Sequence, residues 1–193
     1  MKIKYMIMAM SLMFVMNVSA QEVKGSNEQK SKKELRQEKK AAKKKEQEEH
    51  KAYGRALLES RNFVMKVDRM QNSKTGQMVP TNPTVNFIKV DGDNVTVQFG
   101  DLTDIGMNGV GGVTYNGILQ KFESFDRGEG KAAGVMIQYS SVYARNVITL
   151  YIEITGEQVS ARFNESGTII NMYGQYEPYD GTTVWEGSNR RDF

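Results

Sequence analysis

The chain has 193 residues, of which 39% are hydrophobic, and carries a formal net charge of +3 at pH 7. This length is enough for one ordinary domain with additional segments. The sequence contains no cysteine, which excludes disulfides, thiolate metal sites and cysteine nucleophiles. Its one histidine, His50, lies in the highly charged run EQEEHKAYG, where the positioned surroundings that a catalytic base needs are not expected.

Residues 1–20 have the three parts of a secretory signal peptide. Lys2 and Lys4 give a positive start, an apolar run follows over residues 6–18, and Val-Ser-Ala precedes the expected cleavage between Ala20 and Gln21. The apolar run of about 13 residues is shorter than the roughly 20 that a membrane-spanning helix needs, which argues against a membrane anchor. We therefore predict an exported protein, periplasmic or secreted, with no transmembrane segment in the mature chain.

Residues 21–60 are predicted to form a charged helical arm, because Lys, Glu, Gln and Ala dominate and proline is absent. Residues 24–55 hold 12 Lys and Arg against 6 Glu, a net charge of +6, whereas residues 56–193 hold 12 Lys and Arg against 16 Asp and Glu, a net charge of −4. Near its end the arm has an apolar stripe at helical spacing, formed by Ala52, Tyr53, Ala56 and Leu57. We expect the last two turns to pack on the body and the earlier part to project into solvent.

The basic arm suggests two roles. It could contact an anionic envelope surface, such as lipid phosphates or a negatively charged glycan, or another protein. The simpler alternative is a solvated spacer. Nucleic acid is not expected as a partner, because the arm has almost no aromatic side chains on which bases could stack.

Residues 61–177 change to a hydrophobic period of two. Alternating segments include NFVMKVDRM, NVTVQFG, VMIQY, ITLYIEI and VSARF, separated by turn sequences such as DGDN, TGEQ and NESG. This pattern is typical of antiparallel strands with one buried face. We predict an all-β domain of about eight antiparallel strands, a small barrel or a two-sheet sandwich, preceded by the long charged N-terminal helix. In the C-terminal tail, residues 178–193, the aromatic residues Tyr179 and Trp185 are expected to join Tyr176 in a clasp that packs over the sheet.

The stretch GMNGVGGVTYNG, residues 106–117, resembles a phosphate-binding loop only in its glycines. Such a loop needs a helix after it, whereas this stretch continues into Ile, Leu and Phe in a strand-like pattern without GK[ST]. The glycines therefore indicate a bulge, a tight bend or close sheet packing. The oxygen ligands of the DGDN turn, Asp91, Asp93 and Asn94, fall short of a calcium loop. No catalytic residue, metal site or cofactor is predicted.

Four segments taken together resemble a known family. They are RNFVMKVDRM, NFIKVDGDNVTVQFG, GVGGVTYNGILQKFE and ITLYIEITGEQVSARFNESGTIINMYGQY, with matching positions at Val90, Gly92, Asp93, Val95, Gly111, Gly112, Val113, Tyr115 and Gly117. Over about residues 50–177 they are similar to a domain-of-unknown-function family of exported β-rich proteins from Bacteroides-type bacteria. The segment QFGDLTDIG departs from the apolar stretch that this family usually has there. The resemblance implies an exported β-rich domain, and it implies no activity and no catalytic residue.

Three hypotheses about function follow. The export signal and the missing catalytic residue types favour a non-enzymatic binding or envelope-associated interaction module. The alternative is a lipocalin-like carrier of an apolar small molecule, because eight strands can enclose one ligand. The candidate pocket for that ligand is formed by Met65, Phe99, Tyr139 and Phe163. A hydrolase with paired carboxylates, such as Glu123 and Glu153, is supported by no spacing argument.

Overall fold

The structure, a computed structural model, describes residues 32–102, 106–156, 158–181 and 184–188. The expected signal peptide, its cleavage site at Ala20 and Gln21 and the first part of the predicted arm lie outside the described residues. The described part contains α1 (Lys32–Glu59), β1 (Asn62–Asn72), β2 (Met78–Pro80), β3 (Phe87–Asp91), β4 (Asn94–Phe99), β5 (Val113–Asp126), β6 (Ala133–Ser141), β7 (Ile148–Thr155), β8 (Gln158–Glu165) and β9 (Thr168–Pro178).

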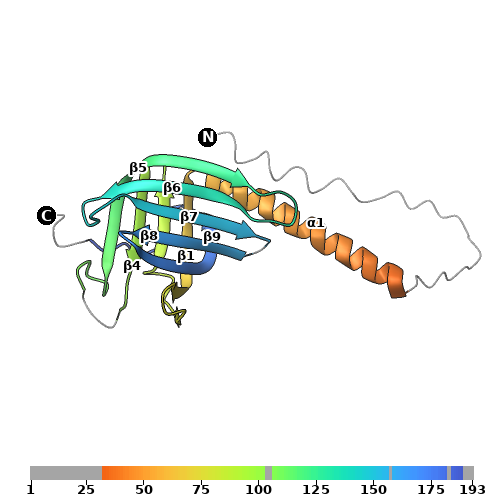
Figure 1. Cartoon of the computed structure of the whole chain (residues 1–193), viewed down its shortest axis with the longest axis horizontal. Helices are drawn as coiled ribbons and strands as arrows, with labels where there is room; N and C mark the ends of the chain where they lie inside the picture. The colour runs from red at the N-terminus through yellow and green to blue at the C-terminus, as the bar shows by residue number, and fades with distance from the viewer. Residues whose placement is uncertain (1–31, 103–105, 157, 182–183, 189–193) are drawn as a thin grey trace, which may run out of the picture. The chain divides into compact units, whose positions relative to one another are not determined.

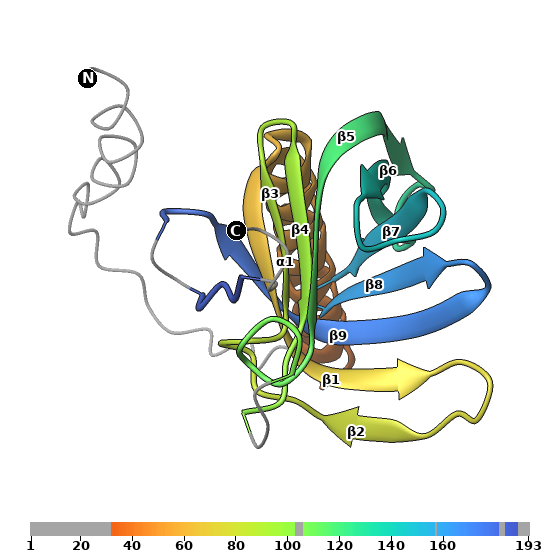
Figure 2. The same ribbon diagram turned by 90° about the vertical axis from the view of Figure 1, so that its left-hand side faces the viewer.

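The strands form a closed antiparallel barrel. Hydrogen bonds link them in the order β1-β3-β4-β5-β6-β7-β8-β9, and β9 pairs back onto β1 from Phe63 with Pro178 to Asn72 with Ile170. Strand β2 pairs with the second half of β1 and lies outside this closed circuit (Figures 1 and 2). The all-β prediction is confirmed, and of the two architectures left open the closed barrel is the one formed.

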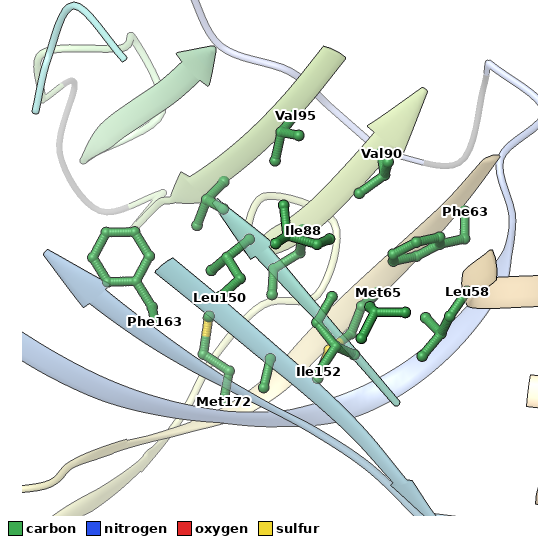
Figure 3. Close-up of a cluster of buried hydrophobic side chains, with 14 of the residues drawn as sticks. Leu58, Phe63, Met65, Ile88, Val90, Val95, Leu150, Ile152, Phe163 and Met172 are labelled. Atoms are coloured by element: carbon green, nitrogen blue, oxygen red, sulfur yellow. The ribbon is translucent and has the colours of Figure 1, made fainter. Parts of the chain in front are cut away.

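Inward-facing apolar side chains make up the core of the barrel. On β7 the residues Ile148, Leu150, Ile152 and Ile154 are buried while Tyr151 is exposed, as the alternation in the sequence predicts. Figure 3 shows Leu150 and Ile152 of β7 together with Ile88 of β3 and Met172 of β9 in this core. An eight-stranded barrel has an interior just wide enough for side chains to fill, which is consistent with this single cluster.

Helix α1 packs on the barrel through its last turns, as predicted, but with a different face. Lys51, Gly54, Leu57 and Leu58 are buried, whereas Ala52, Tyr53 and Ala56 of the predicted stripe are exposed. The reason is Gly54, where any Cβ would overlap the Tyr176 hydroxyl and come within 2.5 Å of Ile154 Cδ1. The helix turns its glycine rather than its alanines and Tyr53 toward the strands, because a glycine permits the closest approach.

A buried lysine anchors this helix to the β5–β6 turn. Lys51 Nζ donates to Asp126 Oδ1 at 2.8 Å and to the Gly128 carbonyl at 2.7 Å. One turn earlier, Glu48 accepts the Gly130 N–H at 2.8 Å. Within residues 37–50 every side chain is exposed apart from the partly buried Glu48, in agreement with the expected solvent exposure of that part of the arm. In the described part of the chain, no helix has the length and apolar character needed to cross a membrane.

Candidate functional site

The four residues of the predicted internal pocket all belong to the packed core. Met65, Tyr139 and Phe163 are buried, and Phe99 packs against the same cluster. Phe99 and Phe163 meet edge to face with ring centroids 5.2 Å apart. Met65 lies near Leu58 and Ile152, away from Phe163 (Figure 3). The structure therefore brings Phe99 and Phe163 together and places Met65 at another level of the core.

One polar atom inside the barrel stands out. The Tyr139 hydroxyl is buried and has no hydrogen-bond partner among the described residues. Burial, reinforced by the neighbouring Tyr115, raises the pKa of Tyr139 well above its ordinary value, so the hydroxyl stays protonated. Gly117 makes room for this ring, since a Cβ at that position would come within 2.6 Å of Tyr139 Cδ2.

The glycine stretch folds as a tight loop over the end of β4, as the close-packing interpretation predicts. A Cβ on Gly112 would overlap the Phe99 carbonyl, so only glycine fits there. The buried Asn108 holds the loop: its amide donates to Phe99 O at 3.2 Å, and its Oδ1 accepts the Gly112 N–H at 3.0 Å. The backbone N–H groups of Asn108 and Gly112 therefore make hydrogen bonds within the loop.

The C-terminal strap, which we define as residues 185–187, crosses the outer face of the barrel at β4 and β5. Gln98 Nε2 donates to Trp185 O at 2.8 Å, and Gln98 Oε1 accepts the Gly187 N–H at 2.8 Å. Thr114 Oγ1 lies 3.0 Å from Gln98 Oε1. The predicted aromatic clasp is wrong: the backbone of the strap makes these contacts, the Trp185 side chain is 61% exposed, and Tyr176 packs against the core instead.

Beside the strap lies a depression of about 750 Å³ on the outer face of β3–β6, which we call the strap groove. Thr96 and Asn116 face each other across β4 and β5 in its floor. Ile118 and Val142 line it with apolar side chains that are 59% and 86% exposed. Its remaining lining residues are Lys89, Asp91, Asn94, Val95, Gly117, Ser140, Ser141 and Glu186.

The floor of the strap groove contains an unsatisfied acceptor. Asn116 Oδ1 is buried and finds no hydrogen-bond partner in the described part of the chain. Lys89 and Glu186 form an ion pair at the strap side of the groove, so their charges largely cancel. The groove therefore offers a neutral amide in its floor and two apolar side chains above it.

A second depression, of about 500 Å³, lies on the outer face of β7–β9 and is lined by Arg127, Tyr151, Glu153, Ser160, Ala161, Arg162, Asn171 and Tyr173. We call it the tyrosine–arginine face. Glu153 is thus drawn into an ion pair with Arg127 at 2.7 Å, while Glu123 pairs with Lys121 at 2.8 Å. Glu123 and Glu153 thus pair with different basic residues, and in the described chain no group of three or more His, Asp or Glu could hold a metal.

Sequence reasoning found neither surface depression. Thr96, Asn116, Tyr151 and Arg162 lie at outward positions of separate strands, where a polar residue is ordinary. Their meeting depends on strand register, for example Thr96 opposite Asn116 and Tyr151 opposite Arg162. The period-two pattern could identify these positions as outward, but not as neighbours.

Comparison with known proteins identifies a family and a related fold. The sequence model of a family described as "Domain of unknown function (DUF4251)" matches residues 43–175. A solved structure, that of a DUF4251 family protein from Bacteroides eggerthii, is 19% identical in sequence with a TM-score of 0.51, covering 64% of this chain and 83% of that chain. At this identity the likeness concerns the fold alone. No curated protein matches the sequence.

Proposed function

This chain belongs to the DUF4251 family, as the resemblance of its strand segments predicts, and we propose that it is an exported, non-enzymatic interaction module that binds a peptide segment of another protein. The binding site is the strap groove. The motivating features are the export signal in the sequence and the chemistry of the groove, which has side chains for recognition and no catalytic pair.

The observation that carries this proposal is the unsatisfied Asn116 Oδ1 in the floor of the groove. Buried polar atoms are nearly always hydrogen-bonded, and each exception needs a reason. A ligand with an N–H or O–H group would supply the missing bond. The Asn116 side chain carries a carbonyl acceptor and N–H donors, as a peptide unit carries a C=O and an N–H, and can therefore pair with one.

The rim of the groove suits an apolar side chain of the same ligand. Ile118 and Val142 are exposed large apolar residues next to the amide floor. An apolar ligand side chain that covers them would remove their apolar surface from water. This burial favours binding by about 25 cal/mol per Å² of apolar area. A peptide group with a neighbouring apolar side chain satisfies both the floor and the rim.

A displayed library of short peptides, selected on the mature protein, tests this proposal. Affinities of the selected peptides are then measured on the wild type and on Asn116→Ala, Ile118→Asp and Asn146→Ala. The first two substitutions should weaken binding by about tenfold or more. Asn116→Ala removes the amide that pairs with the peptide unit, and Ile118→Asp puts a charge where an apolar side chain should pack. Asn146→Ala, which removes an exposed amide on the β6–β7 connection, is the matched control and should bind as the wild type does.

Failure to select any peptide, or selected peptides that bind all four proteins equally, would contradict the peptide-binding role. The lipocalin-like carrier is the alternative that such results would favour. A carrier would need to displace side chains that now fill the barrel around Met65, Phe99, Tyr139 and Phe163. Its own signature is a lipid or metabolite retained in a native mass spectrum after gentle purification.

Export has a separate test. Expression of the full chain in a bacterium with an outer membrane, followed by fractionation and N-terminal sequencing, should give a mature protein that begins at Gln21. Recovery of the chain with Met1 still present in the cytoplasmic fraction would overturn the periplasmic or secreted location.

A further inference from the structure

The tyrosine–arginine face is built as two parallel rows of side chains across the barrel wall. The strand registers place Tyr151 opposite Arg162, Arg162 opposite Asn171, and Asn171 opposite Gln71 in the first row. The second row runs from Glu153 through Ser160 and Tyr173 to Arg69. Neighbouring strands lie about 4.8 Å apart and alternate residues along a strand about 7 Å apart, so the face is a small rectangular array.

The charges in this array leave one guanidinium available. Arg127 pairs with Glu153 at 2.7 Å, and Arg69 pairs with Asp68 at 2.9 Å. Arg162, in the middle of the first row, has no carboxylate partner within the described residues. Its Nε donates to Asn171 Oδ1 at 3.4 Å, a long contact that leaves the terminal nitrogens free for another acceptor. A planar guanidinium of this kind matches a carboxylate with two parallel hydrogen bonds.

Two tyrosines lie near Arg162 in this array, Tyr151 directly opposite it and Tyr173 diagonally in the second row. Tyr151 is 43% exposed beside Arg162. Tyr173 lies in the second row, where Arg69 sits over its ring at 5.8 Å and its hydroxyl approaches Gln71 Oε1 at 3.4 Å. An exposed tyrosine offers an apolar ring surface and a polar tip at the same place. Such a surface suits a ligand with a flat, weakly polar face and hydroxyl groups around its edge.

We propose that this face binds a saccharide that carries a carboxylate, with the carboxylate on Arg162, the sugar ring against Tyr151 and ring hydroxyls on Asn171 and Ser160. The site is separate from the strap groove and does not depend on the peptide-binding role. β7, β8 and β9 are each paired on both sides and offer no free backbone edge to which a ligand could add as a strand. Recognition must therefore come from side chains alone.

Binding of two acidic probes tests the proposal. Tetragalacturonate and a sialylated trisaccharide are titrated into the mature protein and followed by calorimetry or by amide chemical shifts. The methyl ester of tetragalacturonate and lactose serve as neutral counterparts. The acidic probes should bind and their neutral counterparts should bind at least about tenfold more weakly, since the charge-assisted bonds to Arg162 are lost.

Matched variants locate the site. Arg162→Gln and Tyr151→Ala should each weaken the acidic probes by about tenfold while leaving the melting temperature unchanged, because both side chains are exposed. Arg145→Gln removes the same charge from an exposed loop outside the face and should have no effect. Peptides selected on the strap groove should bind Arg162→Gln normally, so failure of either proposal can be told from failure of the other.

Three outcomes would overturn the proposal. The first is that neither acidic probe binds. The second is that Arg145→Gln weakens binding as much as Arg162→Gln, which would mean general attraction of anions. The third is that an oligoglutamate peptide binds the face as tightly as the saccharides do, which would make the ligand an acidic peptide.

Discussion

Gly187 donates its backbone N–H to the Gln98 side chain at 2.8 Å, which joins the strap to the outer face of β4 across 89 positions of sequence. The same glutamine donates to Val85 O at 3.0 Å and to Trp185 O at 2.8 Å. A single fully buried side chain therefore satisfies three backbone groups, those of Val85, Trp185 and Gly187. Burial of an outward-facing glutamine follows from the strap that covers it.

Gln98→Leu should lower the free energy of unfolding by about 2 kcal/mol or more, because it leaves buried backbone groups without partners. Chemical denaturation monitored by circular dichroism measures the change. Gln120→Leu, at an exposed outward position of β5, is the control and should stay within about 0.5 kcal/mol of the wild type. A stable Gln98→Leu protein would mean that the strap does not depend on this residue.

Ile152→Asp should destabilise the barrel severely, by about 4 kcal/mol or more, because it places an unpaired carboxylate in the core. Tyr151→Ser, one position along β7 and facing outward, should cost far less. Thermal melting of both variants compares the two faces of one strand. Equal losses would show that the inward and outward positions of β7 are misassigned.

Tyr139→Phe should leave stability unchanged or raise it by about 1 kcal/mol, since it removes a buried hydroxyl that has no partner among the described residues. The midpoint of urea unfolding provides the comparison. A loss of more than about 1 kcal/mol would indicate that the hydroxyl is bonded in solution, either to water or to a ligand inside the barrel, and would strengthen the carrier alternative.

Stability should fall in acid partly through Asp126. The hydrogen bond from Lys51, followed by that from the Gly128 N–H, holds the pKa of Asp126 below its ordinary value. The charged carboxylate therefore stabilises the folded state above the pKa of the unfolded chain, about 3.9, and this contribution disappears as pH falls through the lower folded pKa. Asp126→Asn should be less stable than the wild type at pH 7 and should lose less stability between about pH 5 and pH 2. Parallel pH curves for the two proteins would contradict this role of Asp126.

The basic arm should bind anionic vesicles weakly at low salt and lose that binding at physiological salt. Lys39, Lys40 and Lys43 are exposed, and attraction to acidic lipid is worth on the order of 1 kcal/mol per basic residue near the surface. Screening acts beyond about 8 Å at physiological ionic strength. Co-sedimentation of the wild type and of Lys39→Gln/Lys40→Gln/Lys43→Gln measures the difference. Strong, salt-independent binding by both proteins would exclude the electrostatic contact, and no binding at all would leave the arm a spacer.

The barrel could be predicted from the sequence because its signal is local. Alternation on segments such as ITLYIEI identifies the inward residues directly, and Ile152 and Phe163 are buried as expected. The short strand β2 was missed, since Met78–Pro80 is exposed throughout and carries no alternation. Its pairing depends on the chain turning back after β1.

The features that could not be predicted depend on which other segment packs against each helix or strand. The rotation of α1 could not be predicted because Gly54 carries no hydrophobic signal, yet it makes the closest approach to Tyr176. The burial of Gln98 could not be predicted either, because its position in β4 faces outward and only the strap covers it. The strap groove and the tyrosine–arginine face likewise arise from cross-strand neighbours that one sequence cannot identify.

The central claim is that ligand binds outside the barrel, in the strap groove, and leaves the packed interior unchanged. Methyl-labelled protein titrated with a selected peptide tests it most directly by nuclear magnetic resonance. We predict that the methyl signals of Ile118 and Val142 shift on binding while those of Ile152 and Leu150 in the core stay in place. Shifts confined to Ile152 and Leu150, with Ile118 and Val142 unmoved, would contradict the claim and place the ligand inside the barrel.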